Sequence, residues 1–281
     1  MLTLRKTITA AVAVAALAPA SAALAATIAG GPGDERLRGT READMIDGNG
    51  GNDRIRGLAG DDQLIGGFGN DRIWGGNGND TIHGVQGNDR LSGGRGDDTV
   101  VGDAAGVGDL TSFDVLFGGA GNDMLMGGDS RDRIHGGSGN DTSSGEGGND
   151  LMAGGAGDDV QDGGAGNDTI FANVGNDTSR GGEGNDRLFA LARRDVTPGP
   201  NGEVDSSGDA LDGGPGDDVF RTRDGEVDRI TCGEGNDRAV LDTVDVITDA
   251  SDQNPKGSCE TVVRRAPRAH DPDAQREDAE Q

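Results

Sequence analysis

The sequence is poor in the bulky side chains from which thick protein cores are built. Aromatic residues make up 2% of its 281 residues, with one Trp and no Tyr, whereas Gly accounts for 54. Deep cores are filled by large apolar side chains, which are rare in this chain. The composition therefore excludes an ordinary globular domain with a thick side-chain core.

Positive charge is also scarce. Asp and Glu outnumber Lys and Arg by 51 to 25, which gives a net charge of -26. Nucleic acids and anionic membranes bind to positively charged surfaces, so neither is an expected partner, whereas cations are. A disordered acidic polymer has a similar composition, and only the order of residues along the chain distinguishes the two.

Long apolar runs are limited to the N-terminal segment. Residues 1–25 have the pattern of a secretory signal peptide, in which Arg5 and Lys6 precede a short apolar stretch and a run of small residues. We predict cleavage after Ala25, with Ala22 as the alternative. The stretch is short for a membrane-spanning helix, so we expect a soluble, secreted, extracellular chain.

Cysteine is equally scarce. Cys232 and Cys259 are the only two in the chain, and export to an oxidising compartment permits a disulfide between them. We predict this internal bridge, with an intermolecular link or two free thiols as the alternatives.

What the sequence has in abundance is a repeat of nine residues. Residues 30–101 divide into eight consecutive nonapeptides, and residues 118–189 into eight more. One unit reads Gly66-Gly67-Phe68-Gly69-Asn70-Asp71-Arg72-Ile73-Trp74. Gly occupies position 1 in fifteen of these sixteen units and position 4 in fourteen, Asp occupies position 6 in fifteen, and position 8 is apolar in thirteen. A fixed period of this kind predicts a solenoid.

The residue types at each position of the repeat indicate its conformation. Gly, Asn and Asp at positions 1 to 6 tolerate the positive φ angles of tight turns. Positions 7 to 9 then form a three-residue strand whose middle side chain alone points inward. Two units make one coil, so units two apart stack on the same side. The predicted fold class is all-β, a parallel β-roll (β-helix solenoid) of GGxGxDxUx nonapeptide repeats.

The in-phase copies of this motif closely resemble the RTX, or hemolysin-type calcium-binding, repeat family over about residues 30–240. The resemblance implies a β-roll in which each Ca²⁺ lies between turns of the same side, bound by position-6 carboxylates and loop carbonyl groups. The implied metal ligands are Asp44, Asp53, Asp62, Asp71, Asp80, Asp89, Asp98, Asp114, Asp123, Asp132, Asp141, Asp150, Asp159, Asp168, Asp177, Asp186, Asp209, Asp218 and Asp237. Glu35 and Glu42 depart from the motif, and their units are expected to bind weakly or to act as a cap.

Calcium is expected to be the condition for folding. One buried aliphatic side chain per unit contributes roughly 1.5–3 kcal/mol, whereas ordering nine residues costs on the order of 1.5 kcal/mol each. Carboxylates stacked about 4.8 Å apart also repel one another. A hard divalent cation removes this repulsion and takes carboxylate and carbonyl oxygens as ligands, so its binding energy becomes folding energy.

The repeat is interrupted twice and ends in a different kind of segment. Within a calcium-binding roll predicted over residues 26–240, inserts fall near residues 102–113 and 190–208. We expect tolerated bulges there, with binding loops as the alternative. Residues 241–263 are predicted to form a C-terminal cap that the disulfide pins, and residues 264–281 to be disordered.

Position 7 differs between the two sides of the roll. One side has Arg36, Arg54, Arg72 and Arg90, eighteen residues apart, with Trp74 beside them at position 9. We expect an outward Arg row on one sheet. A solvated face that offsets neighbouring acids is the favoured interpretation, and docking of an anionic surface or wall polymer is the alternative.

Position 8 is polar in three units of the second block. Ser143, Gln161 and Ser179 are eighteen residues apart and fall on the same side. One sheet therefore loses its inward apolar row for three coils, and we predict that this is the weakest segment of the roll. A ligand groove is the alternative.

The sequence offers little that indicates catalysis. His83, His135 and His270 belong to no Ser-His-Asp or paired-His metal pattern. The predicted function is therefore extracellular calcium binding, without enzymatic activity, by a roll with a structural or interaction role. A calcium-dependent adhesin or cell-surface binding module is the alternative, and a secreted hydrolase is favoured least.

Overall fold

The computed structural model describes residues 25–103, 112–190, 208–250, 254 and 256–266. These residues form 24 β-strands in two parallel sheets of twelve strands each. The predicted signal peptide, apart from its last residue, lies outside the described residues, as do most of both inserts and most of the predicted tail. Within the described ranges, no helix has the length and hydrophobicity needed to cross a membrane.

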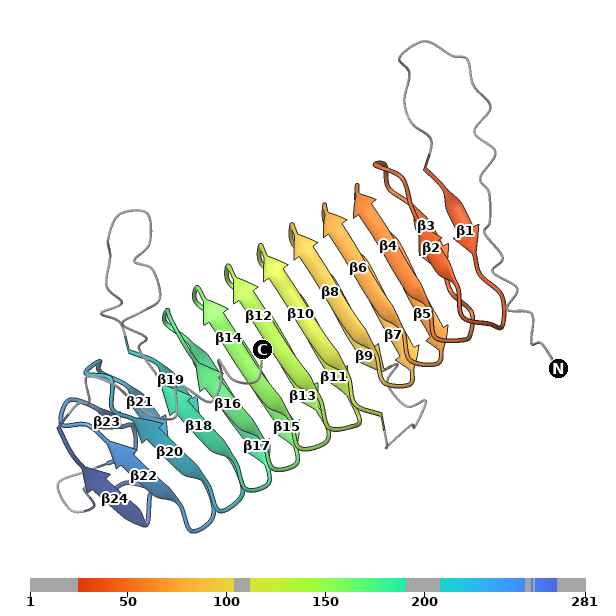
Figure 1. Cartoon of the computed structure of the whole chain (residues 1–281). Helices are drawn as coiled ribbons and strands as arrows, with labels where there is room; N and C mark the ends of the chain where they lie inside the picture. Colours follow the sequence, from red (N-terminus) through yellow and green to blue (C-terminus); the bar gives the residue numbers. More distant parts are fainter. Residues whose placement is uncertain (1–24, 104–111, 191–207, 251–253, 255, 267–281) are drawn as a thin grey trace, which may run out of the picture.

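Odd-numbered strands form one sheet and even-numbered strands form the other, each in sequence order. The odd sheet contains β1 (Thr27–Ala29), β3 (Met45–Asp47), β5 (Gln63–Phe68), β7 (Thr81–Gln86), β9 (Thr99–Asp103), β11 (Met124–Gly128), β13 (Thr142–Glu146), β15 (Val160–Ala165), β17 (Thr178–Glu183), β19 (Ala210–Asp212), β21 (Arg229–Thr231) and β23 (Val246–Ile247). The even sheet contains β2 (Arg36–Arg38), β4 (Arg54–Ala59), β6 (Arg72–Asn77), β8 (Arg90–Arg95), β10 (Val115–Ala120), β12 (Arg133–Ser138), β14 (Leu151–Ala156), β16 (Thr169–Ala172), β18 (Arg187–Ala190), β20 (Val219–Thr222), β22 (Arg238–Leu241) and β24 (Thr261–Arg264). The chain thus winds as a solenoid that changes sheet at every strand, and the predicted all-β roll is confirmed (Figure 1).

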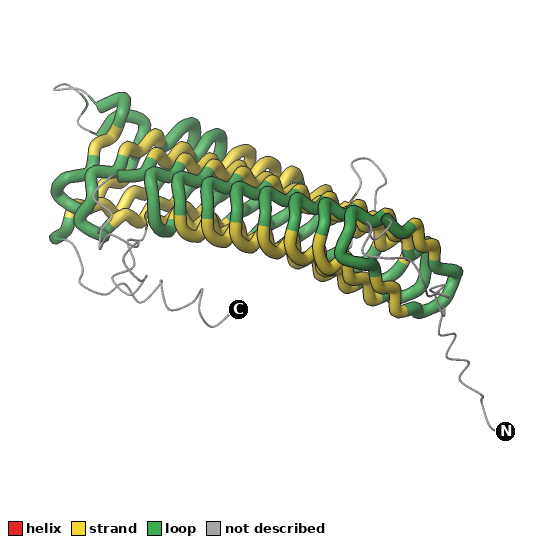
Figure 2. Tube along the Cα trace, turned by 90° about the horizontal axis from the view of Figure 1, so that it is seen from above, coloured by secondary structure: helices red, strands yellow, loops and turns green. Residues whose placement is uncertain are grey.

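Neighbouring strands of a sheet pair residues that are eighteen apart in the regular blocks. Ile55 pairs with Ile73, which pairs with Leu91. The register continues across the first insert, where Leu91 pairs with Leu116. The extra residues therefore leave the stacking of the coils unchanged, and Figure 2 shows this regular stack from above.

Most strands of the roll are longer than the three residues predicted from the motif. β6 runs for six residues, from position 7 of one unit to position 3 of the next, and Gly76 at position 2 has a φ of 127°. The prediction was wrong because a glycine in this conformation bends the chain without ending the ladder. Gly76 still pairs with Gly94 in the next coil. The turn itself is therefore confined to positions 4 to 6.

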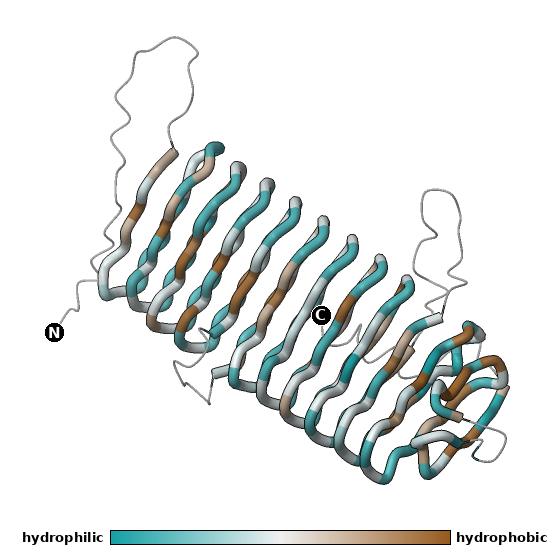
Figure 3. The backbone as a smooth tube through the Cα atoms, turned by 180° about the vertical axis from the view of Figure 1, so that it is seen from behind, coloured by the Kyte–Doolittle hydropathy of each residue, from teal (hydrophilic) through white to brown (hydrophobic). Residues whose placement is uncertain are grey.

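The core is a narrow double row of position-8 side chains. Leu, Ile, Val and Met residues at this position are almost fully buried from Leu37 to Ile170, and hydrophobic and hydrophilic stretches alternate along each coil (Figure 3). Ser143, Gln161 and Ser179 take the same inward place, with 4%, 1% and 1% of their surface exposed. The predicted loss of one apolar row over three coils is therefore present.

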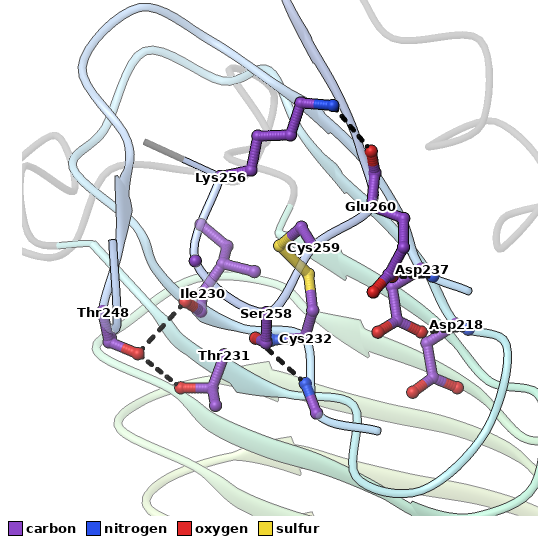
Figure 4. The surroundings of a disulfide bond; sticks show 12 residues. Asp218, Ile230, Thr231, Cys232, Asp237, Thr248, Lys256, Ser258, Cys259 and Glu260 are labelled. Carbon is purple, nitrogen blue, oxygen red and sulfur yellow. Dashed lines mark hydrogen bonds between the residues drawn. A yellow bond between two sulfur atoms is a disulfide. The ribbon is translucent and has the colours of Figure 1, made fainter. Parts of the chain in front are cut away.

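A disulfide between Cys232 and Cys259 joins the last two coils (Figure 4). Its surroundings are held by Ser258, whose hydroxyl oxygen accepts hydrogen bonds from the backbone N–H groups of Cys232 and Gly233 at 3.1 and 3.2 Å. The bridge thus ties the segment between β23 and β24 to the start of the loop before β22. The structure therefore confirms the predicted disulfide between the two cysteines of the chain.

Candidate metal sites

The position-6 aspartates gather in two rows, one in the turns before the odd strands and one in the turns before the even strands. All nineteen predicted ligands are buried, with at most 3% of their surface exposed. The first row contains Asp44, Asp62, Asp80, Asp98, Asp123, Asp141, Asp159, Asp177 and Asp209. The second row contains Asp53, Asp71, Asp89, Asp114, Asp132, Asp150, Asp168, Asp186, Asp218 and Asp237. Carboxylates far apart in the sequence are thereby brought into two continuous lines.

Each row is held together by one repeated hydrogen bond. The backbone N–H of Asp53 donates to Oδ1 of Asp71 at 2.7 Å, and that of Asp71 donates to Oδ1 of Asp89 at 2.7 Å. The same bond links the other consecutive members of both rows, at 2.7 to 3.0 Å. One oxygen of each carboxylate is therefore used to fix the spacing between coils.

The second carboxylate oxygen of most row members has no hydrogen-bond partner although it is buried. This holds for Oδ2 of Asp53, Asp62, Asp71, Asp80, Asp89, Asp98, Asp114, Asp123, Asp132, Asp141, Asp150, Asp159, Asp168, Asp186, Asp218 and Asp237. A buried polar atom without a partner is costly, and a bound ion is one of the few explanations for it. The orphaned oxygens are the strongest structural indication of a cation in these turns.

The glycine at position 1 leaves a space beside these oxygens. A Cβ atom at Gly75 would overlap Oδ2 of Asp80 and the carbonyl oxygen of Gly93 in the next coil. The position is thus kept free of a side chain where a carboxylate and a carbonyl oxygen converge. Calcium takes carboxylate and backbone carbonyl oxygens as ligands, so the residues fit this ion.

Burial and mutual repulsion make the rows resist ionisation. Burial is the largest cause that raises the pKa of Asp80 to about 7; the backbone N–H of Asp62 lowers it and the carboxylate of Asp62 raises it. The pKa of Asp114 is raised to about 9, chiefly by burial, and the carboxylates of Asp89, Asp132 and Asp103 add to the effect. The rows therefore favour either protons or a cation at their carboxylates.

The arrangement offers few side chains to any single ion. Within the residues that the structure describes, no group of three or more His, Cys, Asp or Glu side chains is suited to hold a metal. The carboxylates instead come one per coil along each row, beside backbone carbonyl oxygens such as that of Gly93 near Oδ2 of Asp80. An all-oxygen set of this kind suits calcium, whereas zinc prefers nitrogen and sulfur ligands.

The rows extend beyond the residues that the motif identified. The backbone N–H of Asp209 donates to Oδ1 of Asp228 at 2.9 Å, and that of Asp228 donates to Oδ1 of Asp245 at 3.3 Å. The other row ends where the backbone N–H of Asp237 donates to Oε2 of Glu260 at 2.7 Å. These three acids lie outside the nonapeptide phase. An acid two residues before an inward apolar residue, as in regular units, is the signal that could have found them.

At the N-terminal end, Glu35 takes the place of the first Asp of its row. Its backbone N–H donates to Oδ1 of Asp53 at 2.7 Å, while its own carboxylate accepts from the backbone N–H of Gly31 at 3.2 Å. Asp44 also differs from the regular members, because its Oδ2 accepts the backbone N–H of Thr40 at 2.5 Å. The first unit of each row is therefore partly satisfied by the protein itself.

The predicted Arg row lies on the outer face of the even sheet. Arg36 pairs with Arg54 in register, Arg54 with Arg72, and Arg72 with Arg90, and all four side chains are exposed. Trp74 is next to this row, and the guanidinium of Arg56 lies 5.3 Å from the centroid of its ring. The row therefore faces away from the carboxylate rows in the turns.

Comparison with known sequences gives one family. Its model is described as RTX calcium-binding nonapeptide repeat (4 copies) and matches residues 29–64, 56–91, 74–105, 111–143, 132–161 and 154–188. These ranges cover more than half of the chain, including both blocks of regular repeats. No curated protein matches the chain.

Proposed function

The chain belongs to the family of RTX calcium-binding nonapeptide repeats, and from that membership we propose that its two aspartate rows hold Ca²⁺ and that the roll folds as the ions bind. The observation that carries the proposal is the buried, unpartnered Oδ2 atom that recurs along both rows. A row of such atoms beside side-chain-free glycines is what an oxygen-seeking cation requires.

The dependence of folding on calcium follows from the chemistry of the rows. In an unfolded chain at neutral pH the carboxylates are ionised and hydrated. Folding without metal would bury them in line, where the pKa of Asp89 rises to about 7 and that of Asp150 to about 8. A bound divalent cation supplies the missing partner for Oδ2 and cancels the repulsion, so its binding energy contributes directly to folding.

The roll is proposed to act outside the cell. The disulfide between Cys232 and Cys259 is typical of oxidising compartments, where such bonds persist. Calcium sites of extracellular modules have dissociation constants on the order of 10⁻⁴–10⁻³ M. A chain that folds only at such concentrations would stay unfolded until export and fold on arrival.

The role of the folded roll is proposed to be structural or adhesive, without catalysis. The described side chains are used for stacking, for the two acidic rows and for the outer faces of the sheets. Binding to an extracellular surface is the alternative to a purely structural role, and the outer face of the even sheet favours it.

A calcium titration followed by far-UV circular dichroism tests the proposal. The metal-free chain is expected to show little β-structure and to gain it cooperatively as calcium is added. Magnesium is the matched control, because it demands a small octahedral site and keeps its waters, so it should fail to replace calcium. A chain that is fully β-structured in excess chelator at neutral pH would refute calcium-dependent folding.

A further inference from the structure

The outer face of the even sheet concentrates positive charge in a chain that is strongly acidic. Positions 7 and 9 of β2, β4, β6 and β8 point outward, and six of these eight residues are exposed arginines. The Arg strip consists of Arg36, Arg38, Arg54, Arg56, Arg72 and Arg90. The remaining two outward residues are Trp74 and Ser92, so these eight positions contain no acid.

The Arg strip is poorly compensated by the protein itself. Like charges directly opposite each other on neighbouring strands are destabilising, and Arg54 has an arginine as its partner on both sides. None of the six forms an ion pair with a described acidic side chain. Calcium in the turns would also neutralise the nearby position-6 aspartates, so the anions that remain near the strip are the exposed acids on its flanks, such as Asp34, whose pKa is lowered by hydrogen bonds from Asn52 and also by the charge of Arg54.

Two aromatic rings hold guanidinium groups of the Arg strip without neutralising them. The guanidinium of Arg56 lies 5.3 Å from the Trp74 ring centroid, and that of Arg90 lies 4.7 Å from the Phe117 ring centroid. Such cation–π contacts order a guanidinium and leave its N–H donors available to an anion. One face of each ring is also covered by an arginine, which disfavours the base stacking used by single-stranded nucleic-acid binders.

The Arg strip is narrow and has acids on both flanks. Asp34 is exposed in a turn on one side of the even strands, and Asp61 and Asp97 are exposed in turns on the other. A double helix or a membrane surface is wide enough to bring its phosphates against these acids. A single linear chain can instead follow the strip along the roll axis, where arginines recur about every 4.8 Å.

We propose that the Arg strip binds a linear acidic polysaccharide whose carboxylates pair with the arginine guanidinium groups. Arginine recognises carboxylates bidentately and keeps its charge at any physiological pH. The inference rests on the proposed calcium-dependent folding, because the strip exists only when the coils are stacked. It names the partner chemistry of a surface that the calcium sites do not use.

Trp74 is the only tryptophan in the chain and provides a local reporter for binding. The full chain, loaded with calcium, is titrated with short polygalacturonate oligomers that do not gel, and Trp74 fluorescence is followed. The test variant replaces Arg36, Arg54, Arg72 and Arg90 by Gln. The matched control replaces Arg41, Arg95, Arg131 and Arg229 by Gln; these arginines are exposed outside the strip, so the net charge changes equally.

The oligomer is expected to change Trp74 fluorescence, and added salt to weaken the binding. The test variant should bind about tenfold or more weakly, since four exposed ion pairs are lost, whereas the control should stay within about twofold of the wild type. Equal weakening of both variants, equal binding of a neutral oligosaccharide, or preference for anionic vesicles or single-stranded DNA would overturn the inference. Circular dichroism of the same samples separates the two proposals, because a chain unfolded in calcium refutes both, and a folded chain that does not bind refutes only this one.

Discussion

The backbone N–H of Asp80 donates a hydrogen bond to Oδ1 of Asp98, 2.8 Å away in the next coil of the same side. Oδ2 of Asp98 is buried without a hydrogen-bond partner. The two oxygens of one carboxylate therefore have different tasks, since the first sets the distance between coils and the second is available to a cation. An amide could perform the first task but not the second.

Replacing Asp98 by Asn tests this division of tasks. Asp98→Asn keeps an oxygen acceptor for the backbone N–H of Asp80 but removes the charge. We expect the calcium concentration at the midpoint of folding to rise by about tenfold, equivalent to about 1.4 kcal/mol, as measured by circular dichroism. Asp97→Asn is the control, because Asp97 is adjacent but exposed. Similar shifts for the two variants would show that only net charge matters.

The glycine at position 1 is expected to be required for its lack of a side chain. Gly75→Ala places a Cβ atom against Oδ2 of Asp80 and the carbonyl oxygen of Gly93, so it should weaken calcium binding and lower stability by about 1–3 kcal/mol. At Gly50 the nearest atoms that a Cβ would meet belong to Phe68, at ordinary contact distances of 3.6 Å or more. Gly50→Ala should therefore have little effect in the same calcium titration, and a comparable loss would contradict the proposed site.

The pH dependence is expected to differ in sign between the metal-free and calcium-bound states. Burial raises the pKa of Asp150 and Asp159 to about 8 in the fold, from 3.8. The metal-free fold then binds more protons than the unfolded chain, so its stability is present at low pH and is lost as the pH rises through this window. Calcium affinity should instead increase with pH, because protons compete for the carboxylates.

The loss of metal-free stability with rising pH is measured by circular dichroism of the metal-free chain between pH 3.8 and about 8. These limits are the unshifted and shifted pKa values of Asp150. β-Structure is expected to be greater at the acid end. Calcium titrations at the same pH values measure the expected increase of calcium affinity with pH. A metal-free chain that gains structure as the pH rises would contradict the assignment of buried, protonated carboxylates.

The polar segment of the core remains predicted to be the weakest part of the roll. The Gln161 amide can donate to the Ser179 hydroxyl oxygen and to the carbonyl oxygen of Phe171, each at 3.1 Å. Such hydrogen bonds contribute about 1 kcal/mol each, less than the roughly 1.5–3 kcal/mol of a buried aliphatic side chain.

Hydrogen exchange in calcium should therefore show faster exchange over residues 143–179 than over residues 48–101. Ser143 stacks between Leu125 and Gln161 in the odd sheet, so Ser143→Val should slow exchange in its own coil. Equal protection of the two regions in the wild type would refute the prediction.

Reduction of the disulfide is expected to loosen the C-terminal end first. The Cys232–Cys259 bridge closes a loop with a sequence separation of 27, for which loss of loop-closure entropy corresponds to about 3–4 kcal/mol. A variant with both cysteines replaced by Ser should lose protection in β23 and β24 at lower denaturant concentrations than in β4 to β8, as measured by hydrogen exchange. Uniform destabilisation of all coils would show that the disulfide does not stabilise the C-terminal coils in particular.

Much of the fold could be predicted because each nonapeptide repeats the same physical constraints. The inward place of Ile55, the turn position of Asp53 and the pairing of residues eighteen apart all follow from one unit. The length of the strands did not follow, because the propensity of glycine for turns gives no information about pairing with a neighbouring coil. Gly76 has the expected positive φ and is nonetheless part of the ladder.

The residues that end the two aspartate rows are the part of the candidate site that could not be predicted from the nonapeptide motif. Asp228, Asp245 and Glu260 occupy the same ladder as the regular aspartates, but the glycines that mark a unit are missing around them. Where the phase of a repeat is lost, only the three-dimensional stack shows which acid continues the row. The hydrogen bond between backbone N–H and Oδ1 was likewise invisible in the sequence, because it joins residues in different coils.

Because strands alternate between the two sheets, whether a nonapeptide is odd or even in its order along the chain decides which sheet its side chains belong to. Loss of one nonapeptide would move every later side chain to the opposite sheet. Outward arginines of one sheet would then continue a line of outward threonines on the other, and each aspartate row would continue with aspartates from the other row. Loss or gain of two nonapeptides would leave both faces intact, and so do the existing inserts, across which the register is kept. A lineage that changes the length of such a roll without changing its surfaces can therefore do so only by whole coils.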